Sequence, residues 1–122
     1  MRIIQSIDDL DIPPRYKSFI LTYLQNISNI SFISRVILFG SCAKEAVTKH
    51  SDIDIFITAN REITPDDEVL LMFDSLPPYS TDDLSIDIII QREDVFNSHK
   101  NSFGMVQKQV NKHGVDLSGL LQ

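Results

Sequence analysis

The stretch that decides the fold is GSCAKEAVTKHSDIDIFI, residues 40–57. A Gly-Ser step ends one apolar run, VILF, and further along a second run alternates aspartate with isoleucine. Asp52 and Asp54 on a strand would point to the same face, with their Cβ atoms about 6–7 Å apart. Two like charges so placed are costly unless they share a proton, meet a cation or lie in water. The stretch therefore predicts a strand that carries either a carboxylate site or a solvated face.

The solvated alternative is an edge strand, on which polar and apolar residues alternate without any chemical role. For Asp52 and Asp54 alone this is the commoner pattern. A third aspartate, Asp87, lies opposite the isoleucines of another alternating run, LSIDIIIQ, residues 84–91. If the two strands are neighbours, three carboxylates form a site suited to Mg²⁺ or Mn²⁺, and without clustered Cys or His zinc is disfavoured. His50, the nearest histidine, is expected in an exposed loop.

Gly40 and Ser41 follow the first apolar run and open a short helix-favouring segment. Such a turn can point backbone N–H groups and a hydroxyl outward, and the helix N-terminus adds positive potential. Taken alone, a Gly-Ser step at a strand end is usually only a turn. Next to the carboxylate pair, it predicts a seat for a triphosphate whose metal ions rest on the aspartates.

The rest of the chain predicts helices and strands in alternation. Apolar residues at helical spacing, starting after Pro13, indicate a helix over residues 14–29. A hydroxyl cap, a proline and three acids begin another at Thr64, with Val69, Leu70, Phe73 and Leu76 expected in the core. The expected order is helix 14–29, strand 35–39, short helix 42–47, strand 52–58, helix 65–76, strand 84–91, helix 92–99 and a last helix with Phe103, Val106 and Val110 that ends at Gly114. This order predicts an α/β (α+β) fold, with one sheet and helices packed on it.

Composition sets further limits. With 122 residues and 43% hydrophobic content, the chain is expected to form one domain over residues 1–122. The net charge of −6 opposes attraction to nucleic acid and to anionic lipid. A lone cysteine, Cys42, allows no internal disulfide, and no apolar run is long enough for a signal peptide or a membrane span. We expect a soluble cytoplasmic protein without nucleic-acid or membrane partners.

The residues of the central stretch resemble the nucleotidyltransferase superfamily typified by DNA polymerase beta. Its small bacterial members read G-S-x-A-R-G-x-x-x-x-x-S-D-x-D-L, followed by a third carboxylate on a later strand. Lys44 replaces the usual arginine, Glu45 the usual glycine and Ile55 the usual leucine. The positions that match in register without a gap are Gly40, Ser41, Ala43, Ser51, Asp52 and Asp54.

The resemblance implies a nucleotidyltransferase fold with a small mixed β-sheet, and transfer of a nucleoside monophosphate, most simply AMP from ATP, to an acceptor hydroxyl. It implies that Asp52 and Asp54 hold two Mg²⁺ or Mn²⁺ ions. Asp87 would bind the catalytic ion and help deprotonate the acceptor, while Gly40 and Ser41 would grip the triphosphate.

Lys44 would add a point charge to a phosphate without the fork of an arginine, or would be a solvated helix residue. A chain of this length leaves no room for the acceptor-binding domain of larger members. The resemblance therefore implies a separately encoded helical protein of the HEPN class as partner. The first interpretation is an antitoxin that adenylylates this protein in a toxin–antitoxin pair. The alternatives are a subunit that modifies an antibiotic or another small molecule, and a non-catalytic antitoxin that acts by binding alone.

Overall fold

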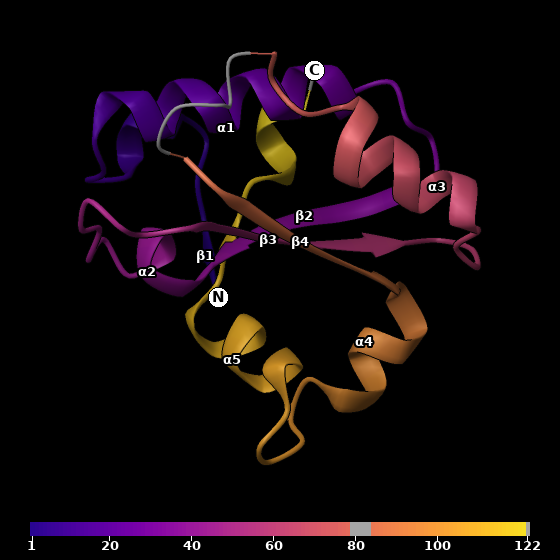
Figure 1. Cartoon of the computed structure of the whole chain (residues 1–122). Helices are drawn as coiled ribbons and strands as arrows, with labels where there is room; N and C mark the ends of the chain where they lie inside the picture. Colours follow the sequence, from indigo (N-terminus) through magenta and orange to yellow (C-terminus); the bar gives the residue numbers. More distant parts are fainter. Residues whose placement is uncertain (79–83, 122) are drawn as a thin grey trace.

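The computed structural model describes residues 1–78 and 84–121. Within these residues, five strands form one mixed sheet in the order β1-β5-β2-β3-β4 (Figure 1). The strands are β1 Arg2–Ile3, β2 Ile33–Phe39, β3 Ile53–Ala59, β4 Ile86–Arg92 and β5 Val115–Asp116. The helices are α1 Pro14–Ile27, α2 Gly40–Ala43, α3 Pro65–Val69, α4 Glu93–His99 and α5 Val106–His113, with single turns η1 Ile7–Asp9, η2 Leu70–Asp74 and η3 Ser118–Leu120. The predicted fold class, a mixed sheet with packed helices, is confirmed.

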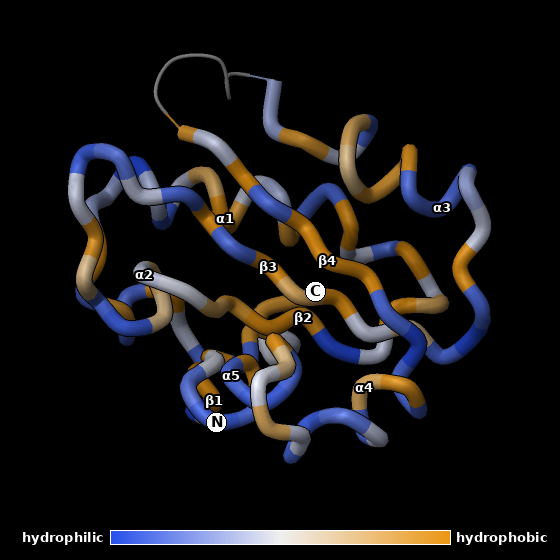
Figure 2. Tube along the Cα trace, turned by 60° about the horizontal axis from the view of Figure 1, so that its bottom comes forward, coloured by the Kyte–Doolittle hydropathy of each residue, from blue (hydrophilic) through white to orange (hydrophobic). Residues whose placement is uncertain are grey.

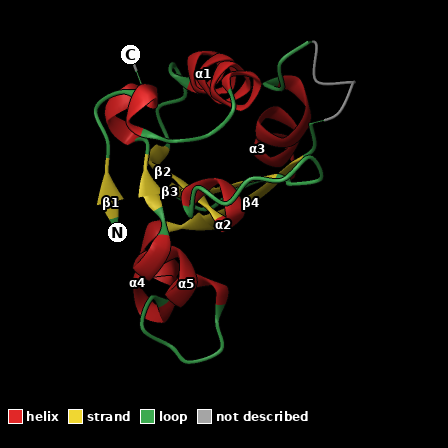
Figure 3. Ribbon diagram, turned by 90° about the vertical axis from the view of Figure 1, so that its left-hand side faces the viewer, coloured by secondary structure: helices red, strands yellow, loops and turns green. Residues whose placement is uncertain are grey.

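Helices cover both faces of the sheet. The α1 and α3 helices lie on one face and α4 and α5 on the other, as the two views in Figures 1 and 3 show. On the first face, Ile53, Ile55 and Ile57 of β3 join the main core. On the second face, Phe56 packs with Phe96 of α4 in a smaller cluster. The strands are accordingly the most continuously hydrophobic part of the chain in Figure 2, and the predicted alternation of β3 is confirmed.

The central position of β3 decides between the two interpretations of its aspartates. It pairs antiparallel with β2 and parallel with β4, so the edge-strand alternative is wrong. The register places Asp54 beside Phe39 of β2 on one side and beside Asp87 of β4 on the other. The two aspartates are therefore direct neighbours across the sheet.

Several element boundaries differ from the prediction. The short helix expected over 42–47 is α2, which begins at Gly40 and ends at Ala43. The structure adds two strands that the sequence pattern did not predict, β1 and β5, each only two residues long, because two residues show no periodicity. Phe103, expected on the last helix, lies before α5, which starts only at Val106, and is 94% exposed.

The buried face of the helix expected over 65–76 was predicted wrongly. Val69, Leu70 and Phe73 were predicted in the core, yet they are exposed, and Leu71 is the fully buried residue. For Leu70 and Phe73 the cause is η2, a π-helical turn over Leu70–Asp74; Val69 lies before it, at the end of α3. A π-helical turn holds more residues than an α-helical one and shifts the buried face along the chain. Leu76 does pack against the core.

The start of α3 carries the hydroxyl cap that the sequence predicts. The Thr64 side chain accepts a hydrogen bond from the Asp67 N–H, at 3.2 Å, and Asp67 accepts one from the Thr64 N–H, at 2.9 Å. Arg61 donates to both Asp67 oxygens, at 2.7 and 3.1 Å. These contacts hold the pKa of the Asp67 carboxyl well below its usual range.

Replacing Thr64 with alanine is expected to lower the free energy of unfolding by about 1 kcal/mol, because the helix loses its cap. Urea denaturation at pH 7 measures the change. Ser18→Ala, at an exposed position inside α1, is the control and is expected to be neutral. Equal stability of Thr64→Ala and wild type would show that the cap contributes nothing.

Candidate active site

Asp54 and Asp87 are the most closely coupled carboxylates of the site. Burial, the charges of Asp87 and Asp52, and a hydrogen bond with Asp87 together raise the pKa of Asp54 from 3.8 to about 6. Burial makes the largest contribution to this pKa shift, and the like charges make the second largest. A bound cation would stabilise the ionised form of Asp54 at this position.

Asp52 lies one residue before β3 and is exposed. Its carboxylate accepts a hydrogen bond from the hydroxyl of Ser85, a residue that the sequence analysis did not single out. The signal was present, because Ser85 lies two positions before Asp87 on the same face of an alternating strand. The Cys42 thiol donates to the Asp52 carbonyl at 3.6 Å, which ties α2 to the start of β3.

Gly40 closes the site from the β2 side. Its φ of +71° lies in the left-handed region, which a glycine adopts at little cost. A Cβ at this position would overlap the Oδ2 atom of Asp54 and would lie 3.1 Å from its Cγ. The absence of a side chain at Gly40 therefore leaves the space that the Asp54 carboxylate occupies.

Ser41 and Lys44 belong to α2 and its end. Ser41 is in the first turn, where backbone N–H groups have no acceptor within the helix. Lys44 is the exposed C-terminal cap residue, and its N–H donates to the Gly40 carbonyl at 3.2 Å. The structure thus places Gly40 against the Asp54 carboxylate, Ser41 next to Gly40, and Lys44 one helical turn away.

The backbone conformation of Glu45 shows why the family pattern has glycine at this position. Its φ is +57°, and Ala46 N–H donates to the Ser41 carbonyl while Glu45 N–H donates to that of Cys42. This pair of bonds is a Schellman motif, whose left-handed residue is usually glycine. The Glu45 side chain forms an ion pair with Arg2 at 3.2 Å and accepts from the Asp11 N–H at 2.6 Å. It therefore secures the N-terminal segment.

Two Glu45 variants separate the backbone cost from the side-chain contacts. Both Glu45→Ala and Glu45→Gly lose the contacts with Arg2 and Asp11, but only glycine relieves the left-handed backbone. We expect the glycine variant to be more stable than the alanine variant by about 1 kcal/mol. Thermal unfolding of the two proteins measures this difference. Equal stability would contradict the strain at this position.

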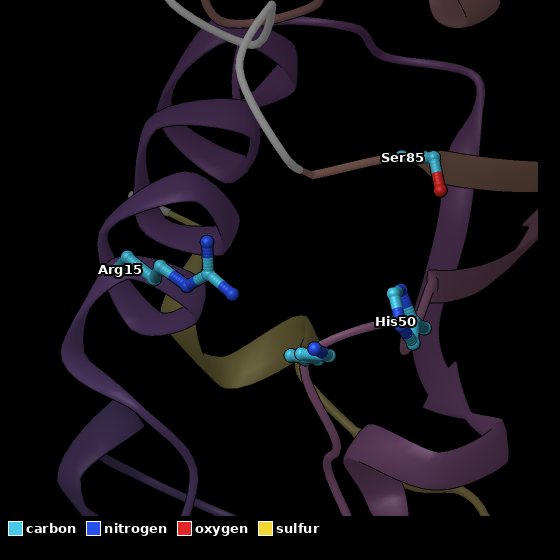
Figure 4. Close-up of a pocket in the computed structure, with 4 residues that line it drawn as sticks. Arg15, His50 and Ser85 are labelled. Atoms are coloured by element: carbon cyan, nitrogen blue, oxygen red, sulfur yellow. The ribbon is translucent and has the colours of Figure 1, made fainter.

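A pocket of about 410 Å³ adjoins Asp52, lined among the described residues by Arg15, Lys49, His50 and Ser85. Figure 4 shows Arg15 reaching in from α1, His50 from the loop before β3, and Ser85 from the position just before β4. The loop is fixed by a turn in which Thr48 N–H donates to the Ser51 hydroxyl at 2.8 Å. His50 is exposed, as predicted.

The comparison with protein families agrees with this geometry. The family model described as polymerase beta, nucleotidyltransferase matches residues 20–118. The chain belongs to this family. The match spans β2, α2, β3 and β4, and so includes every predicted site residue of this nucleotidyltransferase domain. No curated protein and no solved structure gives a significant match.

The nucleotidyltransferase superfamily uses a divalent metal and a nucleoside triphosphate. The carboxylates of this site are the type of ligand that such a metal binds. Carboxylate oxygens are the ligands that Mg²⁺ and Mn²⁺ prefer, and burial, together with the negative charges of Asp87 and Asp52, raises the pKa of Asp54. Within residues 1–78 and 84–121, no three His, Cys, Asp or Glu side chains are arranged as a ready metal centre. Asp52 is engaged with Ser85 instead. The three-carboxylate site stays a prediction, with Asp54 and Asp87 as its assembled part.

The described residues include no helix with the length and apolar character needed to cross a bilayer.

Proposed function

We propose that this nucleotidyltransferase moves AMP from ATP to a hydroxyl of a partner protein, as the antitoxin of a toxin–antitoxin pair formed by a HEPN-class protein and a minimal nucleotidyltransferase. The observation that carries the catalytic part is the register that sets Asp54 beside Asp87, with Gly40 against the Asp54 carboxylate. The antitoxin role and the protein acceptor rest on the resemblance to minimal nucleotidyltransferases, which is an argument by analogy.

In this proposal the site residues bind the metal ions and the triphosphate. Asp54 and Asp87, joined by Asp52, would hold the divalent ions, which supply charge stabilisation for an in-line displacement. Gly40 and Ser41 would seat the triphosphate tail, and Lys44 would place a positive charge near it.

The bond that forms joins the acceptor oxygen to the α-phosphorus, and the bond that breaks joins this phosphorus to the oxygen bridging to the β-phosphate. Pyrophosphate leaves with the electron pair. Asp87 accepts the proton of the acceptor hydroxyl, which increases its nucleophilicity.

The test is label transfer to the helical protein encoded beside this chain, in the presence of Mg²⁺. We expect label on the partner from α-labelled ATP, none from γ-labelled ATP, and none with Asp87→Asn. Label in a small product instead would favour the antibiotic-type alternative. A stable complex without any labelling, with protection intact in Asp87→Asn, would favour inhibition by binding alone.

A further inference from the structure

Two exposed surfaces of opposite charge take no part in the proposed chemistry. The first, which we call the acidic surface, is the outer side of α3 and η2. Residues 66–74 include four Asp or Glu and no Lys or Arg, and all four except Asp67 are exposed. Phe73 is 68% exposed. Residues three and four apart on a helix are neighbours, so the acids and the exposed apolar side chains adjoin. The surface consists of Asp66, Glu68, Val69, Leu70, Phe73 and Asp74.

The second, which we call the basic surface, is formed by the segment between α4 and α5 and by α5 itself. Residues 95–115 contain three lysines and no Asp or Glu, although the whole protein carries a net charge of −6. Phe103 is almost fully exposed, and the Lys108 ammonium lies 5.5 Å from the centroid of its ring. Charge and apolar area therefore adjoin here too. The surface consists of Lys100, Phe103, Met105, Val106, Lys108 and Lys112.

The acidic and basic surfaces lie on opposite sides of the molecule. The α3 helix covers one face of the sheet and α5 covers the other, as Figures 1 and 3 show. The sheet therefore separates the two surfaces, and they cannot contact each other within one molecule. Apolar patches with a polar rim on a protein surface mark interaction sites, so each surface calls for a partner from outside the molecule.

Charge complementarity identifies a second copy of this chain as that partner. Protein interfaces place positive patches against negative ones and use aromatic side chains as anchors. The acidic surface offers Phe73 among carboxylates, and the basic surface offers Phe103 among ammonium groups. An anionic partner would fit only the basic surface and a cationic partner only the acidic one, whereas a second copy satisfies both. Pairing of either surface with itself would bring like charges together.

We propose that the acidic surface of one molecule docks on the basic surface of a second copy. Because the two surfaces differ, the contact is heterologous, and each end of the pair keeps one free surface. Repetition of such a contact gives a ring if the rotation closes and an open chain if it does not. The inference is independent of the proposed function, since it uses none of the residues assigned to metal or nucleotide.

The first test is sedimentation velocity of the full chain over a range of protein concentrations at low salt. We expect the mass to increase with concentration, and added NaCl to weaken association because it screens the opposite charges. Phe73→Ala and Phe103→Ala should each weaken association at least about tenfold. Ile3→Ala is the matched control, because Ile3 of β1 is as exposed as Phe73, at 68%, but lies outside both surfaces. It should associate like wild type.

Mixing the two phenylalanine variants tests the heterologous contact directly. Phe73→Ala keeps an intact basic surface, and Phe103→Ala keeps an intact acidic one. At a concentration where each variant alone is monomeric, the equimolar mixture should form a one-to-one dimer, which cannot grow further. Both positions are exposed, so circular dichroism should show two folded proteins. A wild type that stays monomeric, association that either variant leaves unchanged, or a mixture without dimer would overturn the inference.

Discussion

Replacing Asp54 with asparagine is expected to abolish nucleotidyl transfer and to make the metal-free protein more stable. The rate should fall at least about a thousandfold, because the site loses charge stabilisation worth several kcal/mol in the transition state. Stability should rise because asparagine removes a charge that burial and two like charges disfavour. A pKa shift from 3.8 to about 6 corresponds to about 3 kcal/mol without solvent screening, so we expect a gain of about 1 to 2 kcal/mol at pH 8.

The same shift gives wild type a distinct pH dependence. A raised pKa in the folded state means that Asp54 contributes stability below pH 3.8 that is lost as the pH rises through about 6. Without metal, the free energy of unfolding of wild type should therefore increase from pH 8 to pH 5, and Asp54→Asn should lack this increase. Urea denaturation at several pH values measures both proteins. Asp66→Asn, on the exposed first turn of α3, is the control and should follow wild type. A stability gain without loss of transfer would remove Asp54 from the active site.

Gly40→Ala is expected to lower transfer about a hundredfold, as a displacement of about 1 Å at a reacting group can do. The new methyl group would overlap the Asp54 carboxylate and push it from its position beside Asp87. The left-handed backbone adds a cost of about 1 kcal/mol in stability.

Gly104 provides a matched control for the Gly40 variant. Its φ of +80° imposes the same backbone cost, but a Cβ there would meet nothing within 4 Å. Gly104→Ala should therefore lose similar stability and keep wild-type transfer. Equal transfer rates in the two alanine variants would show that the contact between Gly40 and Asp54 does not matter for catalysis.

The sequence predicted the chemically important part of the site because that part follows from short-range patterns. Strict alternation placed Asp54 and Asp87 opposite their isoleucines, and the Gly-Ser step marked the end of a strand. That the two strands are neighbours, and parallel, depends on contacts between distant segments, and no local pattern encodes it. The Asp52–Ser85 hydrogen bond follows from the same strand pairing, so it became visible only in the fold.

The differences between the predicted and the observed elements have equally specific causes. The helix expected over 42–47 is shorter because Glu45 takes a left-handed conformation that residue type alone does not indicate. The faces of Leu70 and Phe73 were misassigned because the α-helical period was applied across a π-helical turn. The pocket beside Asp52 joins residues from α1, from the loop before β3 and from the position just before β4, and so it has no signature in any single segment.

The central claim is that the carboxylates of Asp54 and Asp87 lie close enough to repel each other, and that a bound divalent cation compensates this repulsion. The most direct test is a titration of the Asp54 carboxyl carbon by NMR, with and without Mg²⁺ and a non-hydrolysable ATP analogue. We expect a pKa of about 6 without metal and a clearly lower one with it, because the bound ion favours the ionised carboxylate. An Asp54 pKa near 3.8 that Mg²⁺ and nucleotide leave unchanged would contradict the account.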